Sequence, residues 1–248
     1  MRVVSLVPSA TESLLHWGVV PVACTRFCCQ PELDHVGGTK DPDLDAIVAL
    51  RPDLVVMCEE ENLLAHHELL VEAGIETFTF RIDCVDDVAP QLAALAGRLE
   101  VGVAGVAPGS GNPGDLSDAG NPGDLAVPAR SAPRARAFVP IWRRPWMTLS
   151  GSTYGSSLLA AAGIDNVYAD AASRYPEVDL DAVRARRPDV VLAPTEPYPF
   201  AERHLDELAW VAPARLVDGQ DLFWWGVRTP AAMRRLRESL AEVVRSSG

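Results

Sequence analysis

The stretch LDAIVALRPDLVV, from Leu44 to Val56, decides the fold because the chain repeats it as LDAVRARRPDVV from Leu180 to Val191. A single offset of 136 residues aligns the two copies. The identical positions are Leu44, Asp45, Ala46, Arg51, Pro52, Asp53 and Val55, which return as Leu180, Asp181, Ala182, Arg187, Pro188, Asp189 and Val191. A self-match of this length within 248 residues indicates duplicated structure, so we predict two similar lobes with a cleft between them.

Each copy has the pattern of a short helix followed by a buried strand. Leu44, Ile47 and Leu50 share one helical face, and Pro52 cannot continue the helix. Residues 54–57 then form a continuous apolar run, which is typical of a parallel strand covered on both faces. Helix and strand patterns alternate through both halves of the chain, and this alternation favours parallel sheets wrapped by helices.

The predicted fold class is therefore α/β, with two parallel-sheet lobes joined by a connecting helix and linker. We expect an N-terminal lobe at residues 1–82, a connecting segment at 83–136 and a C-terminal lobe at 137–248. Lobes of about 100 residues fit the usual size of domains. Within the connecting segment, residues 86–100 have a helical pattern, whereas 102–133 are rich in Gly and Pro and contain GNPGDL twice, which indicates a linker.

Composition excludes several classes of partner. The net charge of −12 argues against nucleic acid and anionic membrane surfaces, and no apolar stretch approaches the roughly 20 residues of a membrane span. The opening MRVVSLVPS enters a strand without an export signal, so the sequence as written predicts a cytoplasmic protein. A periplasmic or cell-surface location is the alternative if a signal is missing. Five cysteines, an odd number, make a poor disulfide framework and are expected to be reduced.

The candidate site lies at the segments that follow the predicted strands. In parallel sheets, ligands bind beyond the carboxyl ends of the strands, so these segments should share one rim in each lobe. Ser9 and Glu12 have the spacing of a capping box, which places a helix N-terminus directly after the first strand. Glu196 stands at the repeat offset from Glu60, so both lobes should present a carboxylate at equivalent positions.

Aromatic and arginine residues concentrate at the same rims. Flat apolar walls with a few polar groups are what a large macrocycle or metal chelate requires. The predicted ligand-binding residues are Ser9, Thr11, Arg26, Phe27, Lys40, Glu60, Asn62, Trp142, Arg143, Trp146, Tyr154, Tyr175, Glu196, Tyr198 and Trp225. Roughly half of the rim aromatics are expected to be core residues, because large aromatic side chains are heavily buried on average.

Two longer motifs carry a resemblance to a known family. RVVSLVPSATE at residues 2–12 and GGTKDPDLDAIVALRPDLVV at 37–56 resemble the cobalamin and iron-siderophore binding proteins of ABC importers. The resemblance covers nearly the whole chain outside the linker. It implies two α/β lobes joined by a backbone helix, a metal-chelate ligand and an ABC permease as partner. Members of that family present one acid per lobe to permease arginines, and the candidates here are Glu68, Glu72, Glu202 and Glu207.

Two other classes of function compete with this interpretation. Direct metal binding would use Cys24, Cys28 and Cys29, or Glu59 to Glu61 with His66 and His67, but neither set has the spacing of a typical site. An enzyme would use Cys28 as a nucleophile, yet the chain has no G-x-S-x-G, Walker or G-x-G-x-x-G motif.

We therefore predict a monomeric solute-binding protein, not an enzyme. It should have no catalytic residue, no metal-ligating residue and no cofactor of its own. The predicted ligand is cobalamin or a related corrinoid first, with a siderophore or haem as the alternatives. The expected partners are this small-molecule metal chelate and an ABC permease.

Overall fold

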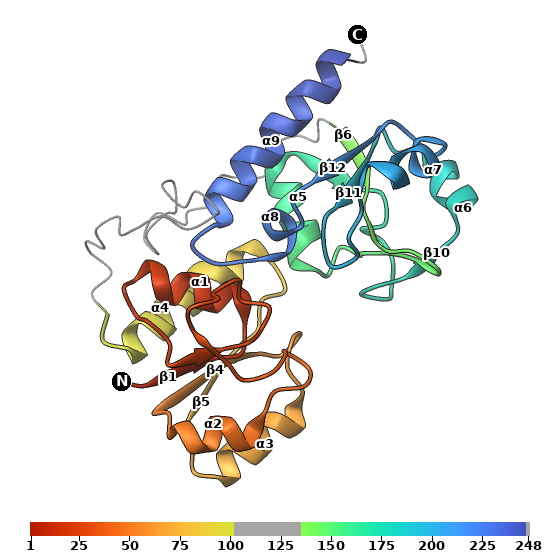
Figure 1. Cartoon of the computed structure of the whole chain (residues 1–248). Coiled ribbons are helices and arrows are strands. Elements are labelled where there is room, and N and C mark those ends of the chain that lie inside the picture. Colours follow the sequence, from red (N-terminus) through yellow and green to blue (C-terminus); the bar gives the residue numbers. More distant parts are fainter. Residues whose placement is uncertain (102–134, 247–248) are drawn as a thin grey trace. The chain divides into compact units, whose positions relative to one another are not determined.

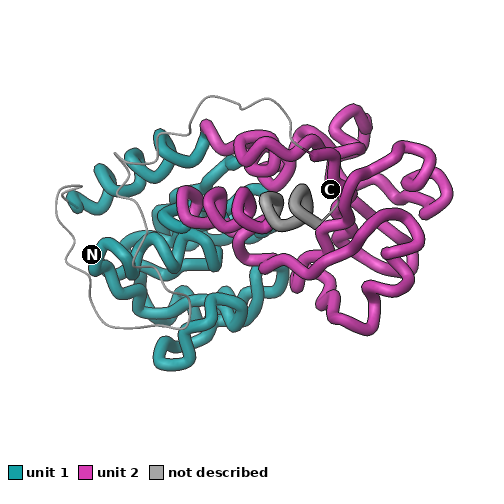
Figure 2. Tube along the Cα trace, turned by 90° about the horizontal axis from the view of Figure 1, so that it is seen from above, with its two compact units in different colours: residues 1–82, 87–125, 225–228 teal, residues 83–86, 126–224, 229–248 magenta. Residues whose placement is uncertain are grey.

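The computed structural model describes residues 1–101 and 135–246, which divide into two compact units (Figure 2). The first unit comprises residues 1–82, 87–101 and 225–228. The second comprises 83–86, 135–224 and 229–246. The Gly- and Pro-rich linker predicted at 102–133 lies outside the described residues, and the lobe boundaries proposed from the sequence stay a prediction.

The first unit is a five-stranded parallel sheet with helices between the strands (Figure 1). Its elements are β1 (Val3–Ser5), α1 (Pro8–His16), β2 (Ala23–Cys24), β3 (Asp34–His35), α2 (Leu44–Leu50), β4 (Leu54–Cys58), α3 (Leu64–Glu72), β5 (Thr77–Phe80) and, after a 3-10 turn at Val85–Asp87, α4 (Val88–Arg98). The strand order is β3-β2-β1-β4-β5. Val55 and Met57 alternate along β4 and pack in a cluster with Ile47 of α2 and Leu70 of α3.

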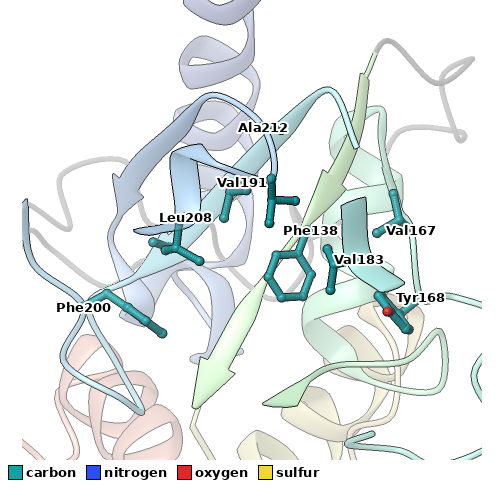
Figure 3. Close-up of a cluster of buried hydrophobic side chains, with 10 residues drawn as sticks. Phe138, Val167, Tyr168, Val183, Val191, Phe200, Leu208 and Ala212 are labelled. Carbon is teal, nitrogen blue, oxygen red and sulfur yellow. The ribbon is translucent and has the colours of Figure 1, made fainter. Parts of the chain in front are cut away.

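The second unit contains a four-stranded parallel sheet and a small antiparallel one. Its elements are β6 (Ala135–Phe138), β7 (Pro140–Trp142), β8 (Trp146–Thr148), α5 (Tyr154–Ala162), β9 (Ile164–Asn166), β10 (Glu177–Val178), α6 (Leu180–Ala185), β11 (Val190–Pro194), a 3-10 turn (Glu202–His204), α7 (Leu205–Ala209), β12 (Ala214–Val217), α8 (Gly219–Phe223) and α9 (Thr229–Ser246). The large sheet has the order β12-β11-β6-β9, and β7, β8 and β10 form the small sheet. In Figure 3, Phe138 of β6 lies in the core with Val183 of α6 and Val191 of β11.

The sequence repeat is a structural repeat. Helices α2 and α6 begin at Leu44 and Leu180, and strands β4 and β11 begin at Leu54 and Val190, so the offset of 136 residues is kept. All five residues of each strand are buried, as the continuous apolar runs predicted. The order β5-β4-β1-β2 in the first sheet corresponds to β12-β11-β6-β9 in the second. The predicted α/β fold with two parallel-sheet lobes is therefore confirmed.

The aspartate of the repeated motif makes the same backbone contacts in both units. The Asp53 carboxylate accepts a hydrogen bond from the Arg2 backbone N–H at 2.6 Å, while the Asp53 N–H donates to the Arg2 carbonyl at 2.8 Å. Asp189 makes the same two contacts with Arg136, at 2.7 and 2.8 Å. Each aspartate thus fastens the start of one central strand to its neighbour, β4 to β1 and β11 to β6.

Two local predictions were wrong. Helix α1 begins at Pro8 with Val7 as N-cap, and no side chain caps it. The capping box of Ser9 and Glu12 does not form, because the helix already begins at Pro8, so Ser9 lies inside its first turn, and the Glu12 carboxylate binds Arg228. The apolar pattern FVPIW at 138–142 predicts a single strand, but the structure divides this segment between β6 and β7.

None of the helices in the described ranges has the length and apolar character needed to cross a membrane.

Candidate functional site

The rim of the second unit carries a cluster of aromatic side chains, defined here as Trp142, Trp146, Tyr198, Phe200 and His204. Trp142 ends β7 and is 45% exposed, and Tyr198 from the loop after β11 meets it edge-to-face at 5.6 Å between ring centroids. Tyr198 in turn contacts buried Phe200 at 4.7 Å, and the Trp146 ring stacks on Phe200 at 6.1 Å. The structure therefore brings together three predicted residues, with Trp142 as the outermost ring.

Charged groups hold this aromatic cluster in place. Arg143 Nε donates to Glu207 Oε2 at 2.9 Å, and the guanidinium lies 5.9 Å from the centre of the Trp146 ring. The hydrogen bond with Glu207 raises the pKa of Arg143. This ion pair fixes a positive charge beside the aromatic wall.

His204 is the buried polar member of the aromatic cluster. Its Nδ1 accepts a hydrogen bond from the Ala201 backbone N–H at 3.0 Å, and its ring meets those of Tyr198 and Phe200 edge-to-face. Burial, reinforced by the positive charges of Arg203 and Arg143, lowers the pKa of His204. The lowered pKa favours the neutral imidazole, which is the form that can accept the hydrogen bond from Ala201. Sequence analysis did not single out His204, because no spacing rule connects it with the aromatic residues before it.

Glu196 lies beside this cluster on the same loop. Its carboxylate accepts a hydrogen bond from Trp224 Nε1 at 2.6 Å. Gly219 packs closely against it, since a Cβ added there would lie 2.4 Å from the Glu196 Cγ. Glu60 and Glu196 each follow the end of their strand by two residues, at equivalent positions in the two units.

The rim of the first unit has one exposed aromatic ring. Phe27, in the loop after β2, is 49% exposed, and the Arg26 guanidinium lies 4.8 Å from its ring centre. Arg26 also pairs with Asp41 at 3.1 Å. Lys40 donates to the Glu60 carbonyl at 2.6 Å and so fastens the loop after β4. Phe27 and Arg26 are therefore presented to solvent.

Three predicted polar residues are buried. The Asn62 side chain accepts from the Cys58 N–H at 2.8 Å and donates to the carbonyls of Leu6 and Thr39. Thr11 Oγ1 donates to the Val7 carbonyl at 3.0 Å, and Ser9 is 1% exposed. These side chains position the rim loops from within.

Two predicted aromatics belong to the cores, and a third lies between core and surface. The Tyr154 hydroxyl bonds Thr229 Oγ1 at 2.9 Å in the second unit. The Trp225 ring packs on Phe80 at 4.5 Å in the first, and both Trp225 and Tyr154 are almost fully buried. Tyr175 is half-buried, with the Arg174 guanidinium 5.9 Å from its ring centre.

Within the described part of the chain, no three His, Cys, Asp or Glu side chains gather closely enough to hold a metal ion. All five cysteines are present as free thiols.

Comparison with known proteins identifies the family. The model of the family described as "Periplasmic binding protein" matches residues 3–208 of the chain. The chain belongs to the periplasmic binding protein family. This family binds solutes, so the prediction that the chain is not an enzyme is confirmed.

Relatives of this periplasmic binding protein share both sequence and fold with it. Vitamin B12-binding proteins of Yersinia pestis and Yersinia pseudotuberculosis are 29% identical over 203 residues, covering 77% of this chain and 68% of theirs. A periplasmic vitamin B12 binding protein of Vibrio cholerae superposes with a TM-score of 0.75 at 20% identity, over 98% of this chain and 97% of that one. A periplasmic heme-binding protein in complex with two hemes gives a TM-score of 0.78 at 21% identity, over 98% of each chain.

Proposed function

We propose that this periplasmic binding protein captures a metal-chelate macrocycle, with cobalamin or a related corrinoid first and haem or a siderophore as the alternatives. The observation that carries the proposal is the exposed Trp142 ring, held edge-on by Tyr198. The 29% identity to vitamin B12-binding proteins supports the same ligand class. The metal would arrive as part of the ligand, and the protein would need no cofactor of its own.

The aromatic cluster suits such a ligand for a physical reason. The wide apolar face of a corrin or porphyrin gains most by leaving water against a rigid flat surface. Trp142 offers that surface, and it is pre-positioned because Tyr198 is itself packed on Phe200. Arg143 would add attraction for an anionic group of the ligand, since its charge is fixed beside the wall by Glu207.

We also propose a compartment and a partner. Membership of the periplasmic binding protein family favours the periplasm over the cytoplasm, and an ABC permease is the partner that the resemblance to importers implies. Glu68 and Glu72 on α3 and Glu202 at the 3-10 turn are exposed and remain candidates for docking it. Glu207 is engaged with Arg143, which argues against it as a docking acid.

Ligand titration with two matched tryptophan variants tests the proposal. Cyanocobalamin, hemin and a ferric siderophore are added separately, and tryptophan emission is corrected for light that the ligand absorbs. Loss of one aromatic wall typically costs about 2–4 kcal/mol, so Trp142→Ala should weaken binding roughly thirty- to a thousandfold. Trp210→Ala is the control, because Trp210 is 47% exposed in the same unit. Trp210 precedes the parallel strand β12 and so lies near the amino ends of the strands, whereas Tyr198 follows the carboxyl end of β11.

The result that overturns the proposal is clear. If all three ligands leave the corrected emission unchanged and calorimetry detects no heat, the chain does not bind this class of ligand. Equal weakening by the two variants would retain the ligand but remove the aromatic cluster as its site.

A further inference from the structure

The loop 195–200, which carries Tyr198, is fixed at its start by contacts with β12 and the residues after it. The Thr195 N–H donates to the Val217 carbonyl at 3.1 Å, and Thr195 Oγ1 accepts a hydrogen bond from the Gly219 N–H at 3.0 Å. Backbone amides and threonine hydroxyls do not titrate near neutral pH. We therefore expect this end of the loop to be the same in neutral solution and in weak acid.

The other end of the loop is fixed by His204, in the 3-10 turn that follows. The Ala201 N–H donates to His204 Nδ1 at 3.0 Å, and the His204 N–H donates to the Ala201 carbonyl at 2.8 Å. The imidazole ring also lies edge-to-face against Tyr198 and Phe200, at 5.6 and 5.7 Å between ring centroids. His204 thus supports Tyr198 twice, through the ring contact and through the backbone at Ala201.

A protonated His204 does not fit this arrangement. Both ring nitrogens of a charged imidazole are donors, so Nδ1 would face the Ala201 N–H as a second donor. The residue is only 7% exposed, so little water can reach the ring to replace the lost hydrogen bond. Protonation should therefore move the ring away from Ala201 and from Tyr198.

The charged groups around the ring act in the same direction. Arg203 in the 3-10 turn and Arg143 between β7 and β8 both oppose a positive charge on His204. Glu207 of α7 favours that charge, but it is already paired with Arg143 at 2.8 Å. The phenol of Tyr198 contacts the ring, and a phenol carries no charge at neutral or acid pH. Burial and the two arginines together lower the pKa of His204.

We propose that His204 is a positioning residue for the ligand: its neutral imidazole holds Tyr198, and through it Trp142, in the arrangement that receives the chelate, and protonation releases both rings. The chelate would then bind well near neutral pH and more weakly in acid. His204 acts through Tyr198 and need not touch the ligand. This inference rests on the proposed function, in which Trp142 is the ring that meets the ligand.

Ligand titrations at pH 7 and pH 5 with two variants of His204 test the inference. His204→Asn places a side-chain oxygen where it can accept the Ala201 N–H, and an amide does not titrate in this range. His204→Phe keeps an aromatic ring against Tyr198 but has no acceptor. The probe is whichever of cyanocobalamin, hemin and the ferric siderophore binds the wild-type chain at pH 7.

The affinity of the wild-type chain should fall between pH 7 and pH 5. If only the neutral form binds, the fall is at most about thirtyfold, which is the limit set by the ordinary histidine pKa of about 6.5. His204→Asn should lose most of this pH dependence, and His204→Phe should bind weakly at both pH values. Groups of the ligand that titrate do so with every variant, so the difference between variants belongs to His204. Equal pH dependence in the wild type and in His204→Asn would overturn the inference.

His16→Asn is the matched control. Burial lowers the pKa of His16 as well, but this residue ends α1 in the first unit. The variant should therefore keep the pH dependence of ligand affinity that the wild type shows. If His16→Asn abolishes that dependence as fully as His204→Asn does, the effect does not belong to the aromatic cluster and the inference fails.

A measurement without ligand separates this inference from the proposed function. The indole N–H resonance of Trp142 is assigned by nuclear magnetic resonance from its absence in Trp142→Phe. It should shift as His204 titrates and should stay in place in His204→Asn over the same pH range. If no chelate binds at pH 7, the proposed function fails, and this resonance alone decides whether His204 positions the aromatic cluster. A Trp142 resonance that does not follow the titration of His204 would refute that role.

Discussion

Arg228 holds Glu12 through two parallel hydrogen bonds of 2.7 Å, although 216 residues separate them in the sequence. The two side chains are only 6% and 11% exposed. Arg228 ends the segment 225–228, which belongs to the first unit, and the neighbouring Val227 N–H donates to Ser13 on the same helix as Glu12. This ion pair fastens a late part of the chain onto helix α1.

Removing one partner of this ion pair should destabilise the first unit strongly. Arg228→Met leaves the Glu12 carboxylate buried without its partner, and breaking a buried pair in this way costs about 3–5 kcal/mol. Urea unfolding measures the effect as a lower midpoint. The control is Arg98→Met, because the Arg98–Glu76 pair is exposed to solvent and should contribute little to stability. Equal losses in both variants would contradict the prediction.

The two repeated aspartates should contribute similarly to stability. Asp53→Ala and Asp189→Ala each remove a charge-assisted hydrogen bond to a backbone N–H at the start of a central strand. We expect each to lower the free energy of unfolding by about 1–3 kcal/mol. Glu68→Ala, on the exposed surface of α3, should change it by no more than about 0.5 kcal/mol. A large loss of stability in only one of the aspartate variants would show that the hydrogen bonds of Asp53 and Asp189 do not contribute equally.

The arginine before each Pro-Asp pair should tolerate glycine well. Arg51 and Arg187 have φ of 48° and 52°, a left-handed conformation that suits glycine at the end of a helix. Arg51→Gly should therefore leave stability unchanged or raise it by up to about 1 kcal/mol, as measured by thermal unfolding. Arg184→Gly inside α6 should have the opposite sign and lower stability by about 1 kcal/mol. A clear loss in Arg51→Gly would mean that its side chain matters more than its backbone.

Acid should weaken the aromatic cluster through His204. Its pKa lies below the ordinary value, so the stabilising neutral form is fully present above about pH 6.5 and is lost as pH falls through the lowered pKa. Protonation places a charge beside Arg203 and Arg143, opposed only in part by Glu207, and removes the acceptor of the Ala201 N–H. His204→Gln should reduce the fall in urea midpoint between pH 7 and pH 5. An unchanged pH slope would refute this role.

The pH experiment needs a second histidine as reference. Burial also lowers the pKa of His16 at the end of α1, so part of the acid sensitivity belongs to the first unit. His16→Gln measures that part separately, and the two effects should add.

The repeat predicted most of the fold because its determinants are local. A helical apolar face, a proline stop and an apolar run are all contained within Leu44 to Val56, and α2, β4, α6 and β11 follow from them. Trp142 and Tyr198 were both predicted at the rim, but their contact was not, because Trp142 ends the antiparallel strand β7 and Tyr198 follows the parallel strand β11.

Other features depend on partners that are distant in sequence. The sequence around Glu12 predicted a capping box with Ser9. No residue near Glu12 in the sequence indicated that its carboxylate would pair with Arg228. Asn62 looked like an exposed rim residue, yet its amide binds three backbone groups from separate segments. Trp225 looked like an exposed rim aromatic, yet its ring packs on Phe80 and is almost fully buried. Long-range pairing of this kind has no periodicity that a sequence pattern can reveal.

The exchange of short segments between the two units makes this chain suited to fragment complementation. Residues 225–228 complete the first unit, and residues 83–86 complete the second, where the Val85 N–H donates to Ser157. A chain opened between residues 101 and 135 would yield two pieces, each carrying a segment that the other piece needs. Neither piece alone would hold a whole unit, so co-expression should restore what separate expression does not. If a test protein is fused to each piece, binding between the two test proteins should bring the pieces together. Recovery of the folded chain would then report that binding.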